Sequence, residues 1–342
     1  MTVNKKILVL IATFILFVSV SCSQEEVQTI TSIEGIVKTE ELKSTEQVIT
    51  QPIRREIFLA PEGAEESLVD SIQTLLPGLE RSYGMEFEPH TAVDQNTLEQ
   101  SNLVIAISPA DIVQLSKTAP NVKFLGVGYS DIQPTDNVSV ITNGAEIVEN
   151  TAFLAGYLSA LITTDYRVGV LIQSNSEEGK RTEDSFYIGA QYFCGLCGSK
   201  YTPIKYYPKS AQINDLNNET DWKSAIDTLV AESVQAVYLP KEIYSTDLIN
   251  YVFERGINIV SANIPPKGVD TGRWISTLEP DYNSAIIQYI RDLPSLTSGM
   301  MIIPEVILTH DSSGLISEGR QMLFEETRSN LMAGFILPSP AQ

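Results

Sequence analysis

The segment AEIVENTAFLAGYLSALITTDYRVGVLI, residues 145–172, decides the fold class. In its first part, Ala145–Ile162, apolar residues recur at helical spacing, among them Leu154 and Leu158 on one stripe. Its last part, Arg167–Ile172, is a short run of valine, leucine and isoleucine, which is typical of a strand buried on both faces. A helix that leads directly into such a strand is the repeating unit of a parallel α/β sheet.

The same alternation continues in both directions from this segment. Short apolar runs are predicted as strands at Glu56–Ala60, Leu103–Ile107, Lys123–Val127, Arg167–Ile172, Val234–Leu239 and Asn258–Ala262. Helical patterns fill the intervals, and the clearest others are Asp221–Ser233, Ser245–Arg255 and Asp281–Arg291. This order predicts an α/β fold with doubly wound parallel sheets, and 342 residues favour two lobes over one. Thr163–Tyr166 is the predicted first crossing between the lobes.

Composition excludes several functional classes. The chain carries 43 Asp and Glu against 23 Lys and Arg, a formal net charge of −20. Such an acidic surface repels phosphate backbones, so nucleic acid is not expected as a partner. With only two histidines, the sequence does not favour a histidine-based zinc site or a Ser-His triad. It also has no P-loop, HExxH or G-x-S-x-G motif. We therefore expect no enzyme, no metal and no cofactor.

The N-terminal residues predict export and lipid attachment. Lys5 and Lys6 precede an apolar run, Ile7–Val18, that is shorter than the ~20 residues of a membrane-spanning helix. The next residues, Ser19-Val-Ser-Cys22, resemble a bacterial lipobox. This resemblance implies a signal peptide that ends before Cys22 and fatty acyl groups, such as palmitate, on that cysteine. Several acyl chains would hold the protein at the extracytoplasmic face of the cell membrane. A plain anchor helix with a buried cysteine is the alternative.

Cys194 and Cys197 form a CxxC pair whose role stays open among three alternatives. A zinc site would need two further ligands, and both histidines, His90 and His310, are distant in sequence. A redox pair of the thioredoxin type would open a helix after a strand, whereas this pair follows a predicted helix. Since thiols oxidise on the outer face of a membrane, we expect a small structural disulfide at a helix end.

Several motifs follow one another in a defined order. They are Asn121-Val-Lys-Phe124, Asn137-Val138, Ala152-Phe-Leu-Ala-Gly-Tyr-Leu-Ser-Ala160, Val168-Gly-Val170, Phe186-x-x-Gly189-Ala190 and Gly334-Phe-Ile-Leu-Pro338. In this order they resemble the basic membrane protein (BMP) family of lipoprotein substrate-binding proteins, which includes purine nucleoside receptors. The resemblance covers residues 55–338. It implies the type I periplasmic-binding-protein fold, in which two lobes joined by a hinge enclose a ligand cleft.

The predicted organisation combines this resemblance with the N-terminal signals. Residues 1–21 are the signal peptide, and residues 22–52, which are rich in Glu, Thr, Ser, Lys and Gln, form a flexible tether. Lobe 1 comprises residues 53–163 and is completed by about residues 275–298. Lobe 2 comprises residues 164–268 and is completed by parts of residues 299–342.

Candidate ligand-binding residues follow the predicted strands, because ligands of open α/β sheets bind beyond the carboxyl ends of the strands. They are Glu65 and Ser67 after the first strand, Ser108 after the second, Tyr129 after the third, and Lys241, Tyr244 and Asn263 in the second lobe. The resemblance adds Phe186 as a stacking aromatic and places Asn263 where the nucleoside receptors carry a ribose-binding aspartate.

Each candidate also has a purely structural alternative. Phe186 can belong to the core, and Tyr129 can close its loop. Ser108 and Asn263 can cap a helix or a turn, and Glu65 can favour a helix N-terminus through the dipole. Lys241 and Tyr244 can belong to a solvated loop.

The sequence departs from the family pattern in the cleft. Glu65 replaces an aspartate, Leu68 a base-stacking phenylalanine and Val69 an asparagine, and the cleft lysine expected near Ser276–Pro280 is missing. We therefore expect a small ligand that is nucleoside-like or another polar or aromatic solute. The resemblance implies delivery to an ABC permease. The alternative is a sensory or accessory lipoprotein of the same fold with an altered or lost ligand site.

Overall fold

The computed structural model describes residues 55–311 and 314–340. The predicted signal peptide, the lipidation site Cys22 and the predicted tether up to residue 52 lie outside the described residues. Within the described ranges, no helix combines the length and the apolar character that crossing a membrane requires.

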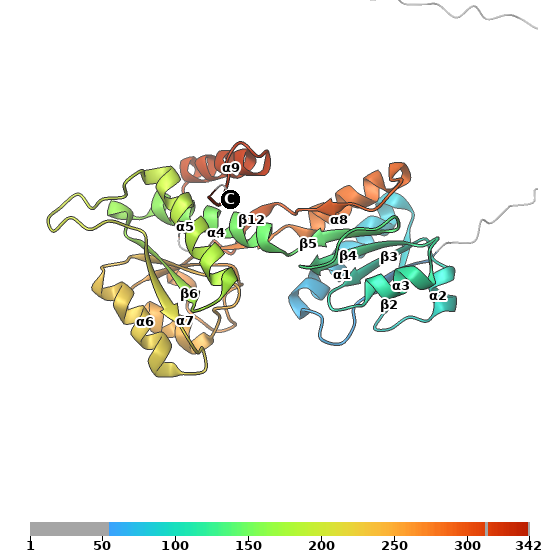
Figure 1. Ribbon diagram of the computed structural model, residues 1–342, viewed down its shortest axis with the longest axis horizontal. Coiled ribbons are helices and arrows are strands. Elements are labelled where there is room, and N and C mark those ends of the chain that lie inside the picture. The colour runs from blue at the N-terminus through green and yellow to red at the C-terminus, as the bar shows by residue number, and fades with distance from the viewer. Residues whose placement is uncertain (1–54, 312–313, 341–342) are drawn as a thin grey trace, which may run out of the picture. The chain divides into compact units, whose positions relative to one another are not determined.

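Two six-stranded sheets form two lobes (Figure 1). The sheet of lobe 1 has the spatial order β11 (Met301–Ile302), β5 (Val138–Thr142), β4 (Lys123–Tyr129), β3 (Leu103–Ile107), β1 (Arg55–Leu59) and β2 (Glu86–His90), and all its pairs are parallel. The sheet of lobe 2 has the order β12 (Val306–Thr309), β10 (Trp274–Pro280), β9 (Asn258–Ser261), β8 (Ala236–Leu239), β6 (Val168–Gln173) and β7 (Lys209–Ile213). There only β12 runs antiparallel to its neighbour. The predicted class, two doubly wound and mainly parallel α/β lobes, is confirmed.

Helices cover both faces of each sheet, as the buried clusters show. In lobe 1, α1 (Glu66–Tyr83) and α8 (Tyr282–Asp292) bury one face, and α2 (Gln95–Glu99) and α3 (Ile112–Thr118) bury the other. In lobe 2, α6 (Glu219–Ala231) and α7 (Thr246–Glu254) cover one face. The opposite face is covered by α4 (Ala145–Ile162), α5 (Glu177–Cys194) and α9 (Glu318–Met332). Short 3-10 turns lie at Thr164–Tyr166, Thr271–Arg273 and Leu293–Ser295.

The predicted lobe boundaries need correction at α4. This helix was assigned to lobe 1, but it packs with α5 and the β6 side of lobe 2. Its sequence explains the error, because 14 of its 18 residues are buried, and a helix without a polar face needs neighbours on every side. Lobe 2 supplies them: the sheet lies on one side, α5 lies beside α4 on the same sheet, and α9 packs on the remaining side. The first crossing therefore lies between β5 and α4, and Thr163–Tyr166 is a turn inside lobe 2.

The segments that follow residue 268 return to both lobes. Helix α8 joins lobe 1, and β12 and α9 join lobe 2. Strand β10 lies in the sheet of lobe 2, although residues from 275 onward were assigned to lobe 1. Strand β11 pairs with β5 of lobe 1, although residues from 299 onward were assigned to lobe 2. The chain thus crosses between the lobes again after β10 and between β11 and β12.

Two glycines bring α4 and α5 into backbone contact. A Cβ atom on Gly156 would lie 2.1 Å from the carbonyl oxygen of Phe186, and one on Gly189 would lie 1.9 Å from that of Phe153. No side chain other than hydrogen fits at such distances. The F-L-A-G and G-A motifs of the sequence therefore mark a close helix–helix contact.

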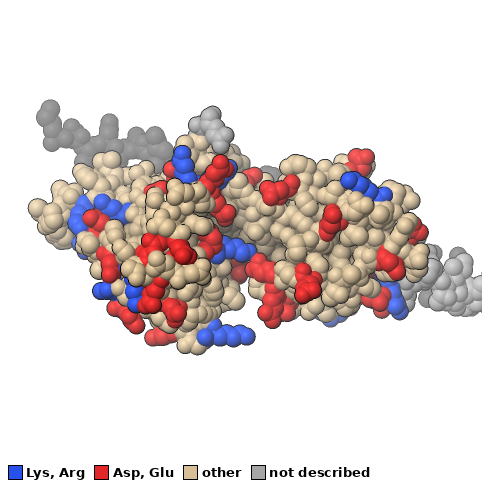
Figure 2. Space-filling model, turned by 60° about the horizontal axis from the view of Figure 1, so that its bottom comes forward, with Lys and Arg blue, Asp and Glu red and all other residues tan. Residues whose placement is uncertain are grey.

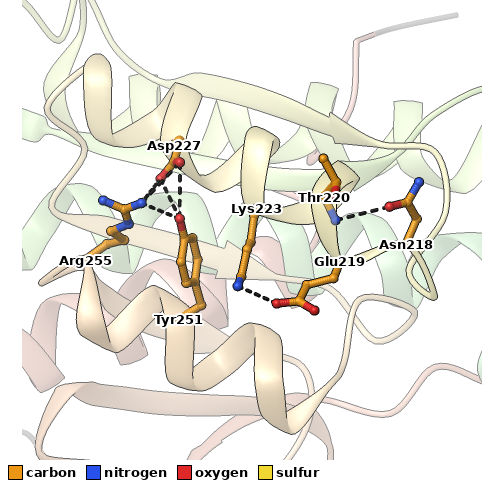
Figure 3. A network of polar contacts seen from close by, with 7 residues as sticks. All are labelled: Asn218, Glu219, Thr220, Lys223, Asp227, Tyr251 and Arg255. Carbon is orange, nitrogen blue, oxygen red and sulfur yellow. Dashed lines mark hydrogen bonds and ion pairs between the residues drawn. The ribbon is translucent and has the colours of Figure 1, made fainter.

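A polar network ties α6 to α7 on the outer face of lobe 2 (Figure 3). Arg255 forms an ion pair with Asp227 at 2.9 Å, and the hydroxyl of Tyr251 donates to the same carboxylate at 3.1 Å. Lys223 lies over the rings of Trp222 and Tyr251. All these side chains bind one another across the helices, so this cluster has a structural role.

Candidate ligand-binding cleft

A cavity of about 330 Å³ lies where the two lobes meet. Lobe 1 contributes the segment after β1 with the start of α1, and the first residues of α8. Lobe 2 contributes the segments after β8 and β9, the end of β10 and the first turns of α4 and α5. These walls include Glu65, Ser67, Leu68, Ser71, Ile147, Glu178, Tyr238, Lys241, Glu242, Tyr244, Asn263 and Tyr282. Most of these segments follow the carboxyl end of a strand, where open α/β sheets bind ligands.

An ion pair crosses the cavity from one lobe to the other. Lys241 Nζ of lobe 2 lies 2.7 Å from Glu65 Oε2 of lobe 1, and the hydroxyl of Ser67 donates to Glu65 Oε1 at 2.9 Å. Burial acts to raise the pKa of the Glu65 carboxyl, but the hydrogen bond and charge of Lys241 and the hydrogen bond of Ser67 outweigh it, so that pKa lies below its ordinary value. The pair is half-exposed, so solvent can reach it.

Asn263 and Tyr244 connect the segments that follow β8 and β9. The side-chain amide of Asn263 donates to the carbonyl oxygen of Lys241 at 3.0 Å, and the hydroxyl of Tyr244 donates to the carbonyl oxygen of Ile264 at 3.1 Å. Both side chains also face the cavity. They therefore hold the position of Lys241 and of the adjacent wall.

Carboxylates dominate the charged lining. Lys241 is the one lysine or arginine among the lining residues described. The acidic lining residues are Glu65, Glu178, Glu242, Glu279 and Asp281. Glu242 Oε1 is buried without a hydrogen-bond partner in the protein. Burial raises the pKa of the Glu242 carboxyl, and the charge of Glu178 raises it further. Since Lys241 is already paired, the remaining wall is acidic.

Aromatic walls come from residues that the sequence analysis did not single out. Tyr238 of β8 lines the cavity although it is almost fully buried, and Tyr282 lines it from the first turn of α8. Burial raises the pKa of both hydroxyls, with further contributions from Glu242 at Tyr238 and from Glu65 at Tyr282. Both tyrosines therefore stay neutral and can donate a hydrogen bond as well as a ring face.

Most predicted site residues line the cavity. Glu65, Ser67, Lys241, Tyr244 and Asn263 are among its walls. Ser108 lines a smaller adjoining cavity of about 220 Å³, which shares Glu65, Leu68 and Tyr282 with the main one. The structure therefore brings residues from several distant segments of the sequence to one place.

Tyr129 and Phe186 are corrections. Tyr129 is buried in the core of lobe 1, and its hydroxyl donates to the carbonyl oxygen of Ala110 at 2.8 Å. Phe186 is buried in lobe 2 and stacks on Tyr238 with ring centroids 5.9 Å apart. Neither ring reaches the cavity, because each faces the interior of its lobe. Phe186 packs against one face of the Tyr238 ring, and Tyr238 is the member of this pair that lines the cavity.

The CxxC pair lies away from the cleft. The structure joins Cys194, the last residue of α5, to Cys197 as a disulfide. Among the described residues, no group of three or more His, Cys, Asp or Glu side chains is placed to hold a metal ion.

Comparisons with known proteins show the fold. No protein-family model matches the chain, and no curated protein matches it by sequence. A solute-binding protein of an ABC transporter system from Conexibacter woesei superposes with a TM-score of 0.58 at 13% identity, over 83% of this chain and 98% of that chain. A transcriptional activator of the comK gene from Bacillus halodurans gives 0.54 at 11% identity, over 83% and 99%. An ABC transporter solute-binding protein from Aeropyrum pernix gives 0.51 at 12%, over 84% and 93%. The chain has the type I periplasmic-binding-protein fold.

Proposed function

We propose that this chain is a solute-binding protein that captures a small molecule between its two lobes. The observation that carries the proposal is the cavity itself. It lies at the carboxyl ends of strands from both sheets and is crossed by the Glu65–Lys241 pair. The chain passes between the lobes at residues 143–144, 281 and 303–305. Short connections of this kind allow lobes to close on a ligand by a hinge motion.

The lining favours a neutral or cationic solute over an anionic one. One paired lysine and five carboxylates line the cavity, and like charges placed together in a cleft repel an anion. Tyr238 and Tyr282 are aromatic lining residues, while carboxylates and Asn263 can accept hydrogen bonds from hydroxyl or amino groups. A nucleoside, or another small polar aromatic solute, combines these features.

The proposal also includes a lipid anchor and a membrane-bound partner. Lipid on Cys22 would keep the protein at the outer face of the cell membrane, where an ABC permease could receive the solute. The similarity of the motifs to the BMP family supports this assignment, as does the fold shared with ABC transporter solute-binding proteins. We propose a binding role and not a catalytic one.

A second candidate is a sensory or accessory lipoprotein. A protein described as a transcriptional activator superposes on this chain about as well as the transport proteins do. The Glu65–Lys241 pair also occupies the position where a ligand could bridge the lobes. Both observations are compatible with a site whose output is a signal to a partner.

Ligand screening by thermal shift tests whether the cavity captures a solute. Residues 23–342 would be heated with nucleosides, bases, sugars, amino acids and small amines. A ligand at 100 times its Kd stabilises the fold by about 2.7 kcal/mol. We expect a shift with a neutral or cationic solute, and its loss in Asn263→Ala and Tyr238→Phe. Lys267→Gln, an exposed change outside the cavity, is the matched control. No shift with any class would contradict the transport proposal and favour the second candidate.

A further inference from the structure

The segment between α5 and β7 forms a long loop, residues 195–208. Figure 1 shows it projecting from lobe 2 on the side away from lobe 1. The Cys194–Cys197 disulfide closes its base, and Gly198 and Tyr206 form a bridge across it. The hydroxyl of Ser199 donates to the carbonyl oxygen of Tyr201 at 3.2 Å and accepts the backbone N–H of Lys205 at 3.0 Å. The loop is therefore held by its own bonds.

Large apolar side chains point outward from this loop. Leu196 is 83% exposed, Tyr201 76%, Ile204 61% and Tyr206 61%. Tyr192 and Phe193 of α5, just before the disulfide, are also exposed. Soluble proteins rarely gather exposed apolar residues in this way unless they contact a partner.

The charge of the loop is opposite to that of the protein. Residues 194–210 contain three lysines, Lys200, Lys205 and Lys209, and no acidic residue. Lys205 and Lys209 both pair with Glu232, at 3.5 and 3.3 Å, which leaves a local excess of positive charge. Elsewhere carboxylates are spread over both lobes on the face that Figure 2 shows. The loop is a basic and aromatic projection of an acidic protein.

We propose that this loop is a docking surface for an anionic lipid bilayer. Tyrosines favour the membrane interface, because one end of the side chain is apolar and the other is polar. Lysines are attracted by the negative lipid headgroups. The repulsion of the acidic body is screened over about 10 Å at 0.1 M salt, whereas the projecting loop would touch the surface. Acylation of Cys22 would bring the protein to a membrane, and the loop would then orient lobe 2 against it.

Vesicle co-sedimentation of residues 23–342, which lack the predicted acylation site, tests the loop without the anchor. Vesicles of phosphatidylcholine with about one third phosphatidylglycerol would be compared with pure phosphatidylcholine. We expect binding to the anionic vesicles and its reduction at high salt. Lys200→Gln should lower the partition coefficient about fivefold, which corresponds to about 1 kcal/mol for one lysine at an anionic surface. Tyr201→Ser with Ile204→Ser should lower it at least tenfold.

Controls and a second readout keep the test specific. Phe335→Ser, at an equally exposed residue outside the loop, and Lys267→Gln should leave binding unchanged. A Tyr201→Trp variant should show blue-shifted emission and quenching by brominated lipid when vesicles are added. Equal binding of all variants, no binding of the parent chain, or an unquenched tryptophan would overturn the proposal. Loop-dependent binding to an integral membrane protein without lipid binding would also overturn it and would favour a protein partner. Solute binding in the cleft is independent of each outcome.

Discussion

The two lobes share one strand order and are packed differently. In each, the first strand to appear in the chain lies one position from an edge, and the last strand comes from the returning C-terminal segment. Lobe 1 places a single layer of helices on each face of its sheet. Lobe 2 buries α4 almost completely, because its sheet, the neighbouring helix α5, which packs on the same sheet, and α9 together enclose it. An equal strand order thus does not mean equal tolerance of substitution, and lobe 2 should be the more sensitive to added volume.

Adding one methyl group to the α4–α5 contact should have the largest effect. We expect Gly189→Ala and Gly156→Ala to lower the free energy of unfolding by about 4 kcal/mol. This exceeds the usual ~1–3 kcal/mol for overpacking, because a backbone carbonyl is in the way. Gly78→Ala in α1 of lobe 1 is the control, since a Cβ there meets no atom within 4 Å. That control should be neutral or stabilise by up to ~1 kcal/mol. Urea unfolding measures both, and equal losses would show that the lobes do not differ.

The disulfide is the next largest difference, because the cysteines of the described chain are both in lobe 2. Cys194→Ser with Cys197→Ser removes a short cross-link with a sequence separation of 3. Loop-closure entropy for so small a ring is worth about 2 kcal/mol. A reductant should lower the melting temperature of the parent chain and have no effect on the double variant. A reductant effect that persists in the variant would contradict this prediction.

The strands that were predicted have apolar side chains on both faces, but β5, which reads VSVIT and is fully buried, was not predicted. The edge strands β2 and β7 were not predicted, because they read EFEPH and KSAQI and direct polar residues to solvent.

Strand β10 was not predicted for another reason. Its Ser276 and Thr277 are fully buried but bonded, since Ser276 donates to the carbonyl oxygen of Thr309 and Thr277 accepts from Trp274 Nε1. A polar sequence is compatible with a central strand when each hydroxyl has a partner.

Which cavity residues could be predicted also depended on which strands had been predicted. Glu65, Lys241 and Asn263, which line the cavity, were candidates because they follow predicted strands. Tyr282 was missed because β10, the strand before it, had not been predicted. The burial of Phe186 could not be read from the sequence, because the direction of a helical side chain depends on which layers enclose the helix. The resemblance suggested a stacking ring at this position, and the ring in the wall is that of its neighbour Tyr238.

Each lobe has one aromatic residue that was expected in the cleft and lies in the core. Phe186→Leu in lobe 2 and Tyr129→Phe in lobe 1 should each cost about 1 kcal/mol of unfolding free energy. The first loses packing volume, and the second loses the hydrogen bond to Ala110. Calorimetry of solute binding should give unchanged affinity for Tyr129→Phe and, at most, a small loss for Phe186→Leu through Tyr238. A tenfold loss for Phe186→Leu would restore this residue to the binding site.

The smallest effect is expected where the lobes meet, at Glu65 and Lys241. A half-exposed ion pair contributes less than about 1 kcal/mol, so Glu65→Gln should change unfolding little at neutral pH. The lowered pKa of Glu65 means that its contribution is present above the ordinary value of 4.5 and is lost as the pH falls through the folded-state value. Glu242 has the opposite sign, because its raised pKa removes stability as the pH rises above 4.5. Denaturant unfolding between pH 3 and 7 should therefore show, for Glu65→Gln, a smaller loss of unfolding free energy as the pH falls. For Glu242→Gln it should show a higher unfolding free energy near neutral pH.

If the Glu65–Lys241 pair also holds the lobes together, small-angle scattering should report a larger radius of gyration for Lys241→Gln, and the same radius for the parent chain and for Lys267→Gln. A radius unchanged in Lys241→Gln would show that the hinge segments alone set the distance between the lobes.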